Sequence, residues 1–272
     1  MSSETSQCGD LNPKGVALVT GAARGIGKAI ALRLASDGFA VAVNDLPSNT
    51  GSLLEVVEEL KKLNVEALAC IADVSVESEV QIMIEEVIAH FPTGRLDVMI
   101  ANAGVAKWNT LIDTTAADWD TVIRVNARGT FLCYKYAALQ MIRQGGGGRI
   151  VGAASICAKK GVPSLGAYCA SKFAIRGLTQ AAAQELGPHA ITCNSYAPGG
   201  ISTDMLGVLA SGNAADSGGT PEDYYEALKA RTPLGCIGDP ADVADVVSFL
   251  ASKESRFITG QSISVNGGTY FD

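Results

Sequence analysis

Short, uninterrupted runs of apolar and β-branched residues alternate with helix-length segments along nearly the whole of this 272-residue chain. A strand that is apolar on both faces lies inside a sheet with helices above and below it, and such sheets are parallel. The pattern therefore predicts a doubly wound α/β fold, with a seven-stranded parallel sheet and helices on both faces. The strands are expected at residues 16–20, 40–45, 67–74, 96–104, 148–155, 191–199 and 261–268.

The segments between these runs have helical spacing, which predicts helices at residues 27–38, 53–64, 79–91, about 105–144 and 167–187. Residues 204–236 break the alternation, because they include the small and polar run ASGNAADSGGTPEDYY. A long insertion after the carboxyl end of a strand is a suitable lid for a ligand site. No linker or repeat divides the remainder, so we expect one domain at residues 15–272, preceded by a flexible polar tail at residues 1–14.

The composition favours a globular protein and argues against several partners. Hydrophobic residues make up 47% of the chain and charged residues 18%, as in a protein with a large core. The net charge of −7 argues against nucleic acid or an anionic membrane as partner. No apolar run approaches the roughly 18 residues of a membrane span. The seven cysteines form no Cys-x-x-Cys pair and no secretory segment is visible, so we expect no metal, reduced thiols and a cytoplasmic location.

A glycine-rich segment, TGAARGIG at residues 20–27, joins the first expected strand to the first expected helix. Gly21, Gly25 and Gly27 would let the backbone turn sharply and bring helix N-terminal amides close to a pyrophosphate. Three glycines alone are a weak signal, but their place between a strand and a helix predicts a dinucleotide site. Ile26, within the same segment, would then also contact the dinucleotide.

Two charged residues make opposite predictions about which dinucleotide binds. Asp45 closes the second strand, where a carboxylate can bind the adenine ribose hydroxyls and repel a 2′-phosphate, and Leu46 follows it. Arg24 could instead pair with a 2′-phosphate. We give Asp45 more weight, because its charge would lie against the discriminating hydroxyl, and predict NAD rather than NADP. The alternative is a simple turn aspartate.

Small or polar residues also end the third and fourth strands. Asp73 and Val74 close the third, and the triplet Asn102, Ala103 and Gly104 closes the fourth. Ligands of open α/β sheets lie at the carboxyl ends of the strands. These residues therefore predict the adenine and ribose contacts, although ordinary strand-end chemistry is an alternative.

The segment AYCASKFAIRGLTQ places Tyr168 four residues before Lys172, on one face of an expected helix. A lone pair of this kind is usually a surface contact. An ammonium about 4 Å from a phenol attracts its anion by about 4 kcal/mol at an effective dielectric of about 20, which would lower the phenol pKa by about 3. The pair therefore predicts an acid/base that exchanges protons near neutral pH.

These motifs together resemble the NAD(P)-dependent short-chain dehydrogenases/reductases, over roughly residues 14–272. The resemblance implies a single-domain Rossmann fold, a homotetramer, and a catalytic tetrad of Asn126, Ser155, Tyr168 and Lys172. Asn126 would hold a water that relays protons, and Lys172 would also bind the nicotinamide ribose. The remaining cofactor contacts that it implies, around the nicotinamide, are Pro198, Gly199, Ile201 and Thr203.

Within that family the chain looks most like acetoin (diacetyl) reductases, also called 2,3-butanediol dehydrogenases. A compact apolar pocket would suit a small ketone or secondary alcohol, with Trp108 as a further candidate for its border. The pocket is expected to contain Ser155, Ile156, Val162, Met205 and Leu206. A polyol dehydrogenase, a 3-oxoacyl-thioester reductase, possibly NADP-linked, and a non-catalytic cofactor-binding protein remain alternatives.

The remaining candidate nucleophiles and bases are not expected to act in catalysis as such. Ser155 lacks a Gly-x-Ser-x-Gly surround and a nearby histidine, which argues against a hydrolase. His90 and His189 are expected at the surface. Cys157 and Cys169 are expected to be small packing residues, or alternatively thiols whose alkylation blocks the site.

Overall fold

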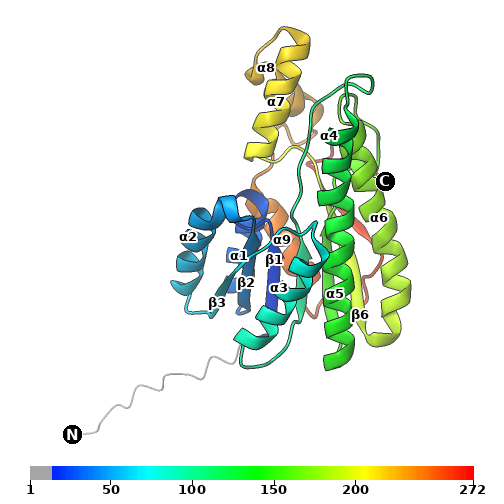
Figure 1. The fold of residues 1–272 in the computed structure, drawn as a ribbon. Helices are drawn as coiled ribbons and strands as arrows, with labels where there is room; N and C mark the ends of the chain where they lie inside the picture. The colour runs from blue at the N-terminus through cyan, green and yellow to red at the C-terminus, as the bar shows by residue number, and fades with distance from the viewer. Residues whose placement is uncertain (1–13) are drawn as a thin grey trace, which may run out of the picture.

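The computed structural model describes residues 14–272. The predicted tail at residues 1–14 therefore lies outside the described residues, except for Lys14. Seven strands form one all-parallel sheet in the order β3-β2-β1-β4-β5-β6-β7, which confirms the predicted doubly wound fold (Figure 1). The strands are β1 (Val16–Thr20), β2 (Ala40–Asp45), β3 (Ala67–Ile71), β4 (Val98–Ala101), β5 (Gly148–Ala153), β6 (Ile191–Pro198) and β7 (Ser262–Val265).

Alternate side chains of each central strand face opposite layers of helices. In β1, Ala17 and Val19 pack with one core, and Val16 and Leu18 pack with the other. The first core is covered by α1 (Gly25–Ser36), α2 (Thr50–Lys61) and α9 (Pro240–Ala251). The second is covered by α3 (Glu77–His90), α5 (Gly129–Gln144) and α6 (Gly166–Leu186). Burial on both faces explains why the strands read as continuous apolar runs.

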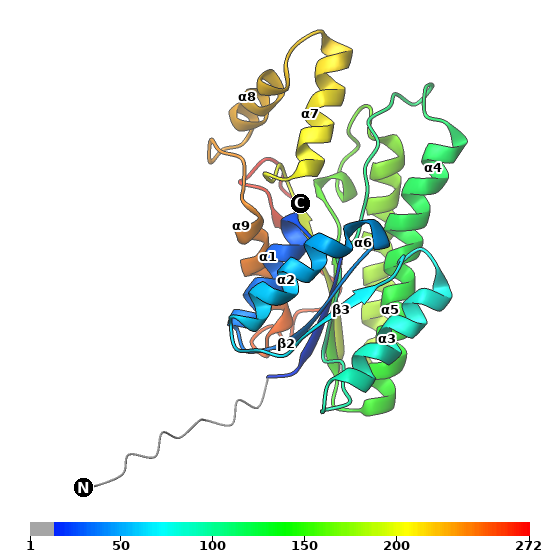
Figure 2. The same ribbon diagram turned by 60° about the vertical axis from the view of Figure 1, so that its left-hand side comes forward.

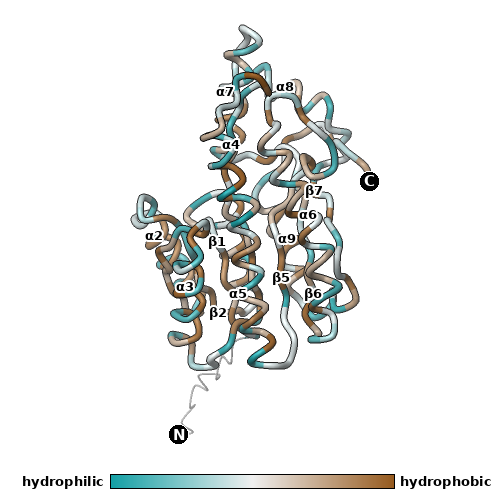
Figure 3. The backbone as a smooth tube through the Cα atoms, turned by 45° about the vertical axis from the view of Figure 1, so that its right-hand side comes forward, coloured by the Kyte–Doolittle hydropathy of each residue, from teal (hydrophilic) through white to brown (hydrophobic). Residues whose placement is uncertain are grey.

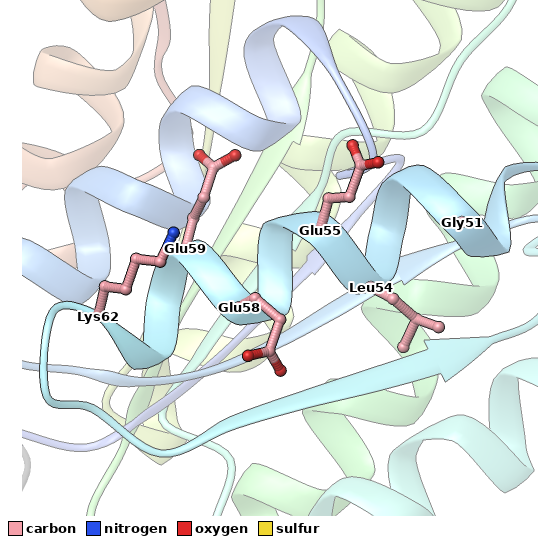
Figure 4. Close-up of a pocket in the computed structure, with 6 residues that line it drawn as sticks. All are labelled: Gly51, Leu54, Glu55, Glu58, Glu59 and Lys62. Carbon is pink, nitrogen blue, oxygen red and sulfur yellow. The ribbon is translucent and has the colours of Figure 1, made fainter.

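The covering helices each bury one side and expose the other. Along α3 and α5 the hydropathy alternates between hydrophobic and hydrophilic, as a half-buried helix requires (Figure 3). Helix α2 buries Leu53 and Leu60 in the core, while its outer surface carries charged side chains. Figure 4 shows this outer surface, lined by Gly51, Leu54, Glu55, Glu58, Glu59 and Lys62. It is a solvated helix face, and none of these six residues lines the cavity that contains the predicted site residues.

The predicted helix at about 105–144 is wrong at its N-terminal end. Helix α4 (Ala116–Val122) begins only after a loop, and it continues through a π-helical segment, η2 (Ile123–Arg128), into α5. Within the loop, Thr110 bonds the amide of Asp113, with Oγ1 and N 3.3 Å apart. Thr115 then caps α4 through the amide of Asp118, at 3.1 Å. These side-chain hydrogen bonds compete with those of a helix, which explains why α4 begins later than predicted.

The insertion after β6 is helical. It forms α7 (Asp204–Ser217) and α8 (Pro221–Arg231), each started by a threonine N-cap, Thr203 and Thr220. Both helices stand beyond the carboxyl end of the sheet, at the top of the view in Figure 2. The short helical turns η1 (Pro47–Asn49), η3 (Ile156–Ala158) and η4 (Gly187–His189) complete the described elements. No described helix is both long and apolar enough to cross a membrane.

Candidate active site

A cavity of about 1290 Å³ runs along the carboxyl ends of the strands and beneath α7 and α8. The strand order reverses between β1 and β4, which is where open α/β sheets bind ligands. Every residue predicted for the cofactor and the substrate pocket lines this cavity, as do Ser155, Tyr168 and Lys172. Asn126 alone of the predicted set is absent from the lining and lies fully buried behind it.

The glycine-rich turn leaves space where a side chain would block the cavity floor. Gly21 has φ +64°, and a Cβ there would lie 2.8 Å from the Cα of Ala103. A Cβ on Gly27 would lie 2.2 Å from the carbonyl oxygen of Gly21. Among the described residues, no side chain caps the start of α1, and its first residues, Gly25, Ile26 and Gly27, line the cavity. Exposed amides at a helix N-terminus fit a pyrophosphate.

A group of hydrogen bonds, which the sequence did not predict, fixes this turn to the end of β4. The Asn102 amide donates to the carbonyls of Thr20 and Gly21, at 2.8 and 3.0 Å, and the Thr20 hydroxyl accepts from the backbone of Asn102. The buried Tyr196 hydroxyl donates to Asn102 Oδ1 at 2.7 Å. The Asn102 side chain therefore holds the backbone of the turn in its conformation. Tyr196, inside the sixth apolar strand, gave no sequence signal beyond core packing.

Asp45 lies at the end of β2 with its carboxylate fixed by three donors. Oδ2 accepts from the amide of Ala23 at 3.0 Å, and Oδ1 accepts from the amide of Leu46 and the side chain of Asn49. These bonds tie the glycine-rich turn to the strand that carries the charge. Each carboxylate oxygen can accept further hydrogen bonds, so the group remains able to bind ribose hydroxyls.

Arg24, the residue that could favour a 2′-phosphate, is engaged elsewhere. Its Nη1 lies 2.9 Å from Oδ2 of Asp204, the first residue of α7. Both side chains are mostly exposed, so the pair contributes at most about 1 kcal/mol to stability. It links the glycine-rich turn to the helix that follows β6.

The other predicted cofactor residues reach the cavity with local partners of their own. Asp73 Oδ1 accepts from the amide of Ser75 at 2.8 Å, which forms a turn after β3. Val74 is buried and packs where a Cβ on Gly129 would fall. The end of β6 and the segment that follows it also line the cavity, with Pro198, Gly199, Ile201 and Thr203.

Ser155, Tyr168 and Lys172 converge at the centre of the cavity. Ser155 follows β5 and starts η3, where its Oγ accepts from the amide of Cys157 at 3.1 Å. Tyr168 and Lys172 lie one turn apart in α6, and Lys172 Nζ is 5.3 Å from the centroid of the Tyr168 ring. The shared helix face predicted from their spacing is thus present. Lys172 also donates to the carbonyl of Ala153, at 2.7 Å.

The pKa of Tyr168 differs in direction from the expectation. Burial raises it above its ordinary value, Cys157 raises it further, and the Ser155 hydroxyl only partly opposes this. Burial therefore outweighs the lowering of the Tyr168 pKa that was expected from Lys172. Burial also lowers the pKa of Lys172 to about 8. The phenol is consequently protonated at neutral pH and ready to donate.

The buried Lys172 predicts a specific dependence of stability on pH. Its pKa is about 8 in the folded protein and about 10.5 in the unfolded chain. The unfolded state therefore binds more protons between these values, and stability gains about 3 kcal/mol as pH rises through that window. We expect Lys172→Met to remove this gain. Urea unfolding of both proteins at pH 7 and pH 10.5 measures it, since other groups titrate alike in each. A constant difference between the two proteins would contradict it.

Asn126 occupies the π-helical segment η2, a distortion that is frequent at functional sites. Its Oδ1 accepts from the amide of Val105 at 2.8 Å, and its Nδ2 donates to the carbonyl of Val105 and to Ser171. Its side chain thus fixes the segment after β4. The predicted water-holding role of Asn126 stays a prediction.

Apolar side chains form the end of the cavity beyond Ser155. Ile156, Val162, Met205 and Leu206 line it as predicted, and Trp108 does so as well. Sequence reasoning missed Tyr224 of α8, which lines the same end and lies in the stretch expected to form a lid. No periodicity in that stretch singles it out.

The structure also shows the positions of the cysteines and histidines considered in the sequence. Cys157 and Cys169 are buried free thiols beside the site, and the Cys169 sulfur accepts from the amide of Val162 at 3.4 Å. The Cys157 thiol beside it lowers the pKa of Cys169. His90 and His189 are exposed, as expected.

Comparisons with known proteins agree on one family. The model of the family described as "Enoyl-(Acyl carrier protein) reductase" matches residues 21–270. A short-chain dehydrogenase/reductase of Armillaria gallica is 52% identical, over 94% of this chain and 96% of that protein. The 3-oxoacyl-[acyl-carrier-protein] reductase FabG of Staphylococcus aureus is 41% identical, over 93% and 97%. A short-chain type dehydrogenase/reductase from Mycobacterium marinum has a similar crystal structure, with TM-score 0.86, 32% identity, and coverage of 96% and 97%.

Proposed function

Because the chain belongs to the short-chain dehydrogenase/reductase family, whose members are oxidoreductases acting on CH–OH groups, we propose that it reduces an uncharged ketone with NADH. The observation that carries this proposal is the continuity of the cavity. One space joins the glycine-rich turn and Asp45 to Ser155, Tyr168 and Lys172.

The residues present fit a nicotinamide dinucleotide. The free amides of α1 would hold its pyrophosphate, and Asp45 would hold its adenine ribose. Lys172, which lines the cavity, would bind the nicotinamide ribose. The dinucleotide, when bound, supplies the hydride that reduces the carbonyl carbon.

Side chains of the protein would orient and protonate the carbonyl oxygen of the substrate. Ser155 donates a hydrogen bond that orients it, and the protonated Tyr168 donates the proton that completes the alcohol. Lys172 supplies positive charge as the phenol loses its proton, and this stabilises the phenolate. In the direction of alcohol oxidation the phenol must first ionise. Because burial raises its pKa, oxidation should accelerate as pH rises, while reduction should persist at neutral pH.

Two substrate classes have support beyond the general chemistry. Diacetyl and acetoin are favoured by the sequence resemblance and by the apolar lining of Ile156 and Val162. A 3-oxoacyl thioester is favoured by the name of the S. aureus relative. Initial rates with diacetyl, acetoin, a short polyol panel and an acetoacetyl thioester, each with both dinucleotides, test the proposal. Reduction of at least one ketone supports it, and the absence of turnover with every ketone contradicts it.

Asp45 is expected to set the preference for NADH. The ion pair between Arg24 and Asp204 supports this, because it engages the side chain that could otherwise pair with a 2′-phosphate. We expect Asp45→Asn to lower the ratio of kcat/KM for NADH to that for NADPH by roughly tenfold or more, since the charge that repels a 2′-phosphate is removed. Asp73→Asn is the matched control. It removes a carboxylate elsewhere in the same cavity and should change the ratio little. A wild-type enzyme that prefers NADPH would contradict the assignment.

The predicted homotetramer and cytoplasmic location stay predictions. Apolar side chains on the outer faces of α5 and α6 support self-association. Phe131, Leu139 and Phe173 are each 45–50% exposed. Light scattering that gives the mass of one 28.1 kDa chain at working concentration would contradict the tetramer.

A further inference from the structure

Two aromatic side chains form one wall of the cavity beyond Ser155 and Tyr168. Trp108 belongs to the loop between β4 and α4, and Tyr224 belongs to α8. Their ring centroids are 6.1 Å apart and their planes meet at 87°. This edge-to-face arrangement is favourable for aromatic pairs, and it leaves ring surface exposed to the cavity.

Trp108 is held in place by the helix above it. Its indole Nε1 donates to Oδ2 of Asp216 in α7, at 2.7 Å. The ring also fills the space beside Gly212 of the same helix, where a Cβ would lie 2.4 Å from the Trp108 Cγ. Helix α7 can therefore approach this closely only because residue 212 is glycine.

The backbone next to Trp108 is fixed from the opposite side. Asn109 pairs with Leu165 in an isolated parallel bridge, and its amide donates to the carbonyl of Ser164 at 2.9 Å. The indole is thus clamped between the loop that follows Ser155 and helix α7. A side chain fixed by a ring contact and by a hydrogen bond at its polar end is a rigid binding surface.

The surroundings of the two rings are apolar. Leu165, Val162, Met205 and Leu209 belong to the same hydrophobic cluster as Trp108. Burial raises the pKa of Tyr224, so its phenol stays neutral. The Asp216 carboxylate that lies closest to Trp108 is bonded to the indole. The other charged group near the rings is Arg231, which lines the cavity close to Tyr224.

We propose that Trp108 and Tyr224 form an aromatic subsite that binds a flat cyclic group of the ketone substrate, with α7 sealing the subsite by docking on Trp108. This inference rests on the proposed ketone reduction and deepens it. A fused-ring ketone can place its carbonyl at Ser155 and Tyr168 while its ring packs on the indole. A four-carbon diketone has no ring to place there, and a linear acyl chain gains no stacking.

Steady-state kinetics with three ketones test the subsite. They are 2-tetralone, diacetyl and the N-acetylcysteamine thioester of acetoacetate, compared in wild type and in Trp108→Leu. We expect Trp108→Leu to lower kcat/KM for 2-tetralone roughly 20-fold, mainly through KM, and to change that for diacetyl less than about threefold. Trp119→Phe is the matched control, because this other tryptophan is 41% exposed on α4, and it should leave all three unchanged.

A binding measurement separates the subsite from the chemistry. The chain has two tryptophans, so in Trp119→Phe the fluorescence comes from Trp108 alone. We expect 2-tetralone, added with oxidised dinucleotide so that no turnover occurs, to change this fluorescence saturably. Diacetyl at the same concentration should not. Because this readout needs no catalysis, it also detects the subsite in Tyr168→Phe.

The outcomes are distinguishable. Selective loss of 2-tetralone turnover in Trp108→Leu, together with saturable fluorescence change, supports the subsite. If the wild type reduces diacetyl or the thioester better than 2-tetralone, and 2-tetralone leaves the fluorescence unchanged, the subsite is wrong and the proposed function stands. If no ketone is reduced but 2-tetralone still binds at Trp108, the subsite stands and the proposed function is wrong.

Discussion

Tyr168→Phe is expected to lower kcat for ketone reduction by about 10²–10⁴-fold, the range contributed by a positioned general acid. The phenol is the proton donor that lies beside Ser155 at the centre of the cavity, and burial keeps it protonated at neutral pH. Phenylalanine keeps the ring and its packing, so the variant should fold and bind NADH normally. Stopped-flow reduction at saturating substrate, with NADH affinity from fluorescence titration, measures the two properties separately.

A matched control for this variant exists in the chain. Tyr136 of α5 also donates a hydrogen bond from its hydroxyl, to Glu77 at 3.0 Å, and it does not line the cavity. Tyr136→Phe should retain activity within about twofold, because this half-buried residue lies outside the cavity. Tyr168→Phe turnover close to that of the wild type, for every ketone that the wild type reduces, would overturn the assignment of the acid.

Gly21→Ala is expected to weaken NADH binding by roughly 100-fold or more and to lower stability by about 2 kcal/mol. The left-handed backbone of residue 21 disfavours any side chain by about 1–2 kcal/mol. Its methyl group would also meet the Cα of Ala103, which is backbone and cannot rotate away. The turn must therefore shift, and the amides at the start of α1 shift with it. Isothermal titration with NADH and thermal unfolding measure the two effects.

Gly51→Ala supplies the comparison. A Cβ on Gly51 would have no atom within 4 Å, and the residue lies on the outer face of α2 (Figure 4). Alanine is the better helix former, so stability should rise by about 0.5–1 kcal/mol with NADH binding unchanged. Equal NADH affinity in Gly21→Ala and Gly51→Ala would show that the turn does not hold the dinucleotide.

Much of the fold was predictable because burial leaves a periodic mark on the sequence. The strands of a parallel sheet are apolar on both faces, and each helix has one apolar face. The start of α4 escaped prediction, because Thr110 and Thr115 form side-chain hydrogen bonds that periodicity does not register. The helices of the insertion were not predicted either. In α7 the apolar residues do not gather on one face, so periodicity gives no helix signal, and the clearest local signal is its N-cap, Thr203.

The predicted site residues were found through motifs, while the residues that support them were not. The glycines, Asp45 and the Tyr168–Lys172 pair have characteristic spacing along the chain. Tyr196 and Tyr224 reach the site only through the tertiary fold, from a buried strand and from the insertion. The direction of the Tyr168 pKa shift could not be predicted from the sequence either, because it depends on how deeply the fold buries the phenol.

The most direct test of the central claim follows a labelled hydrogen from the dinucleotide to the ketone. The enzyme is supplied with [4,4-²H₂]NADH and the ketone that it reduces fastest, and the alcohol is analysed by mass spectrometry. The account predicts one deuterium on the carbinol carbon, formed in step with NADH oxidation and nearly abolished in Tyr168→Phe. NADH oxidation without deuterium on that carbon, or an alcohol formed while NADH is unchanged, would contradict it.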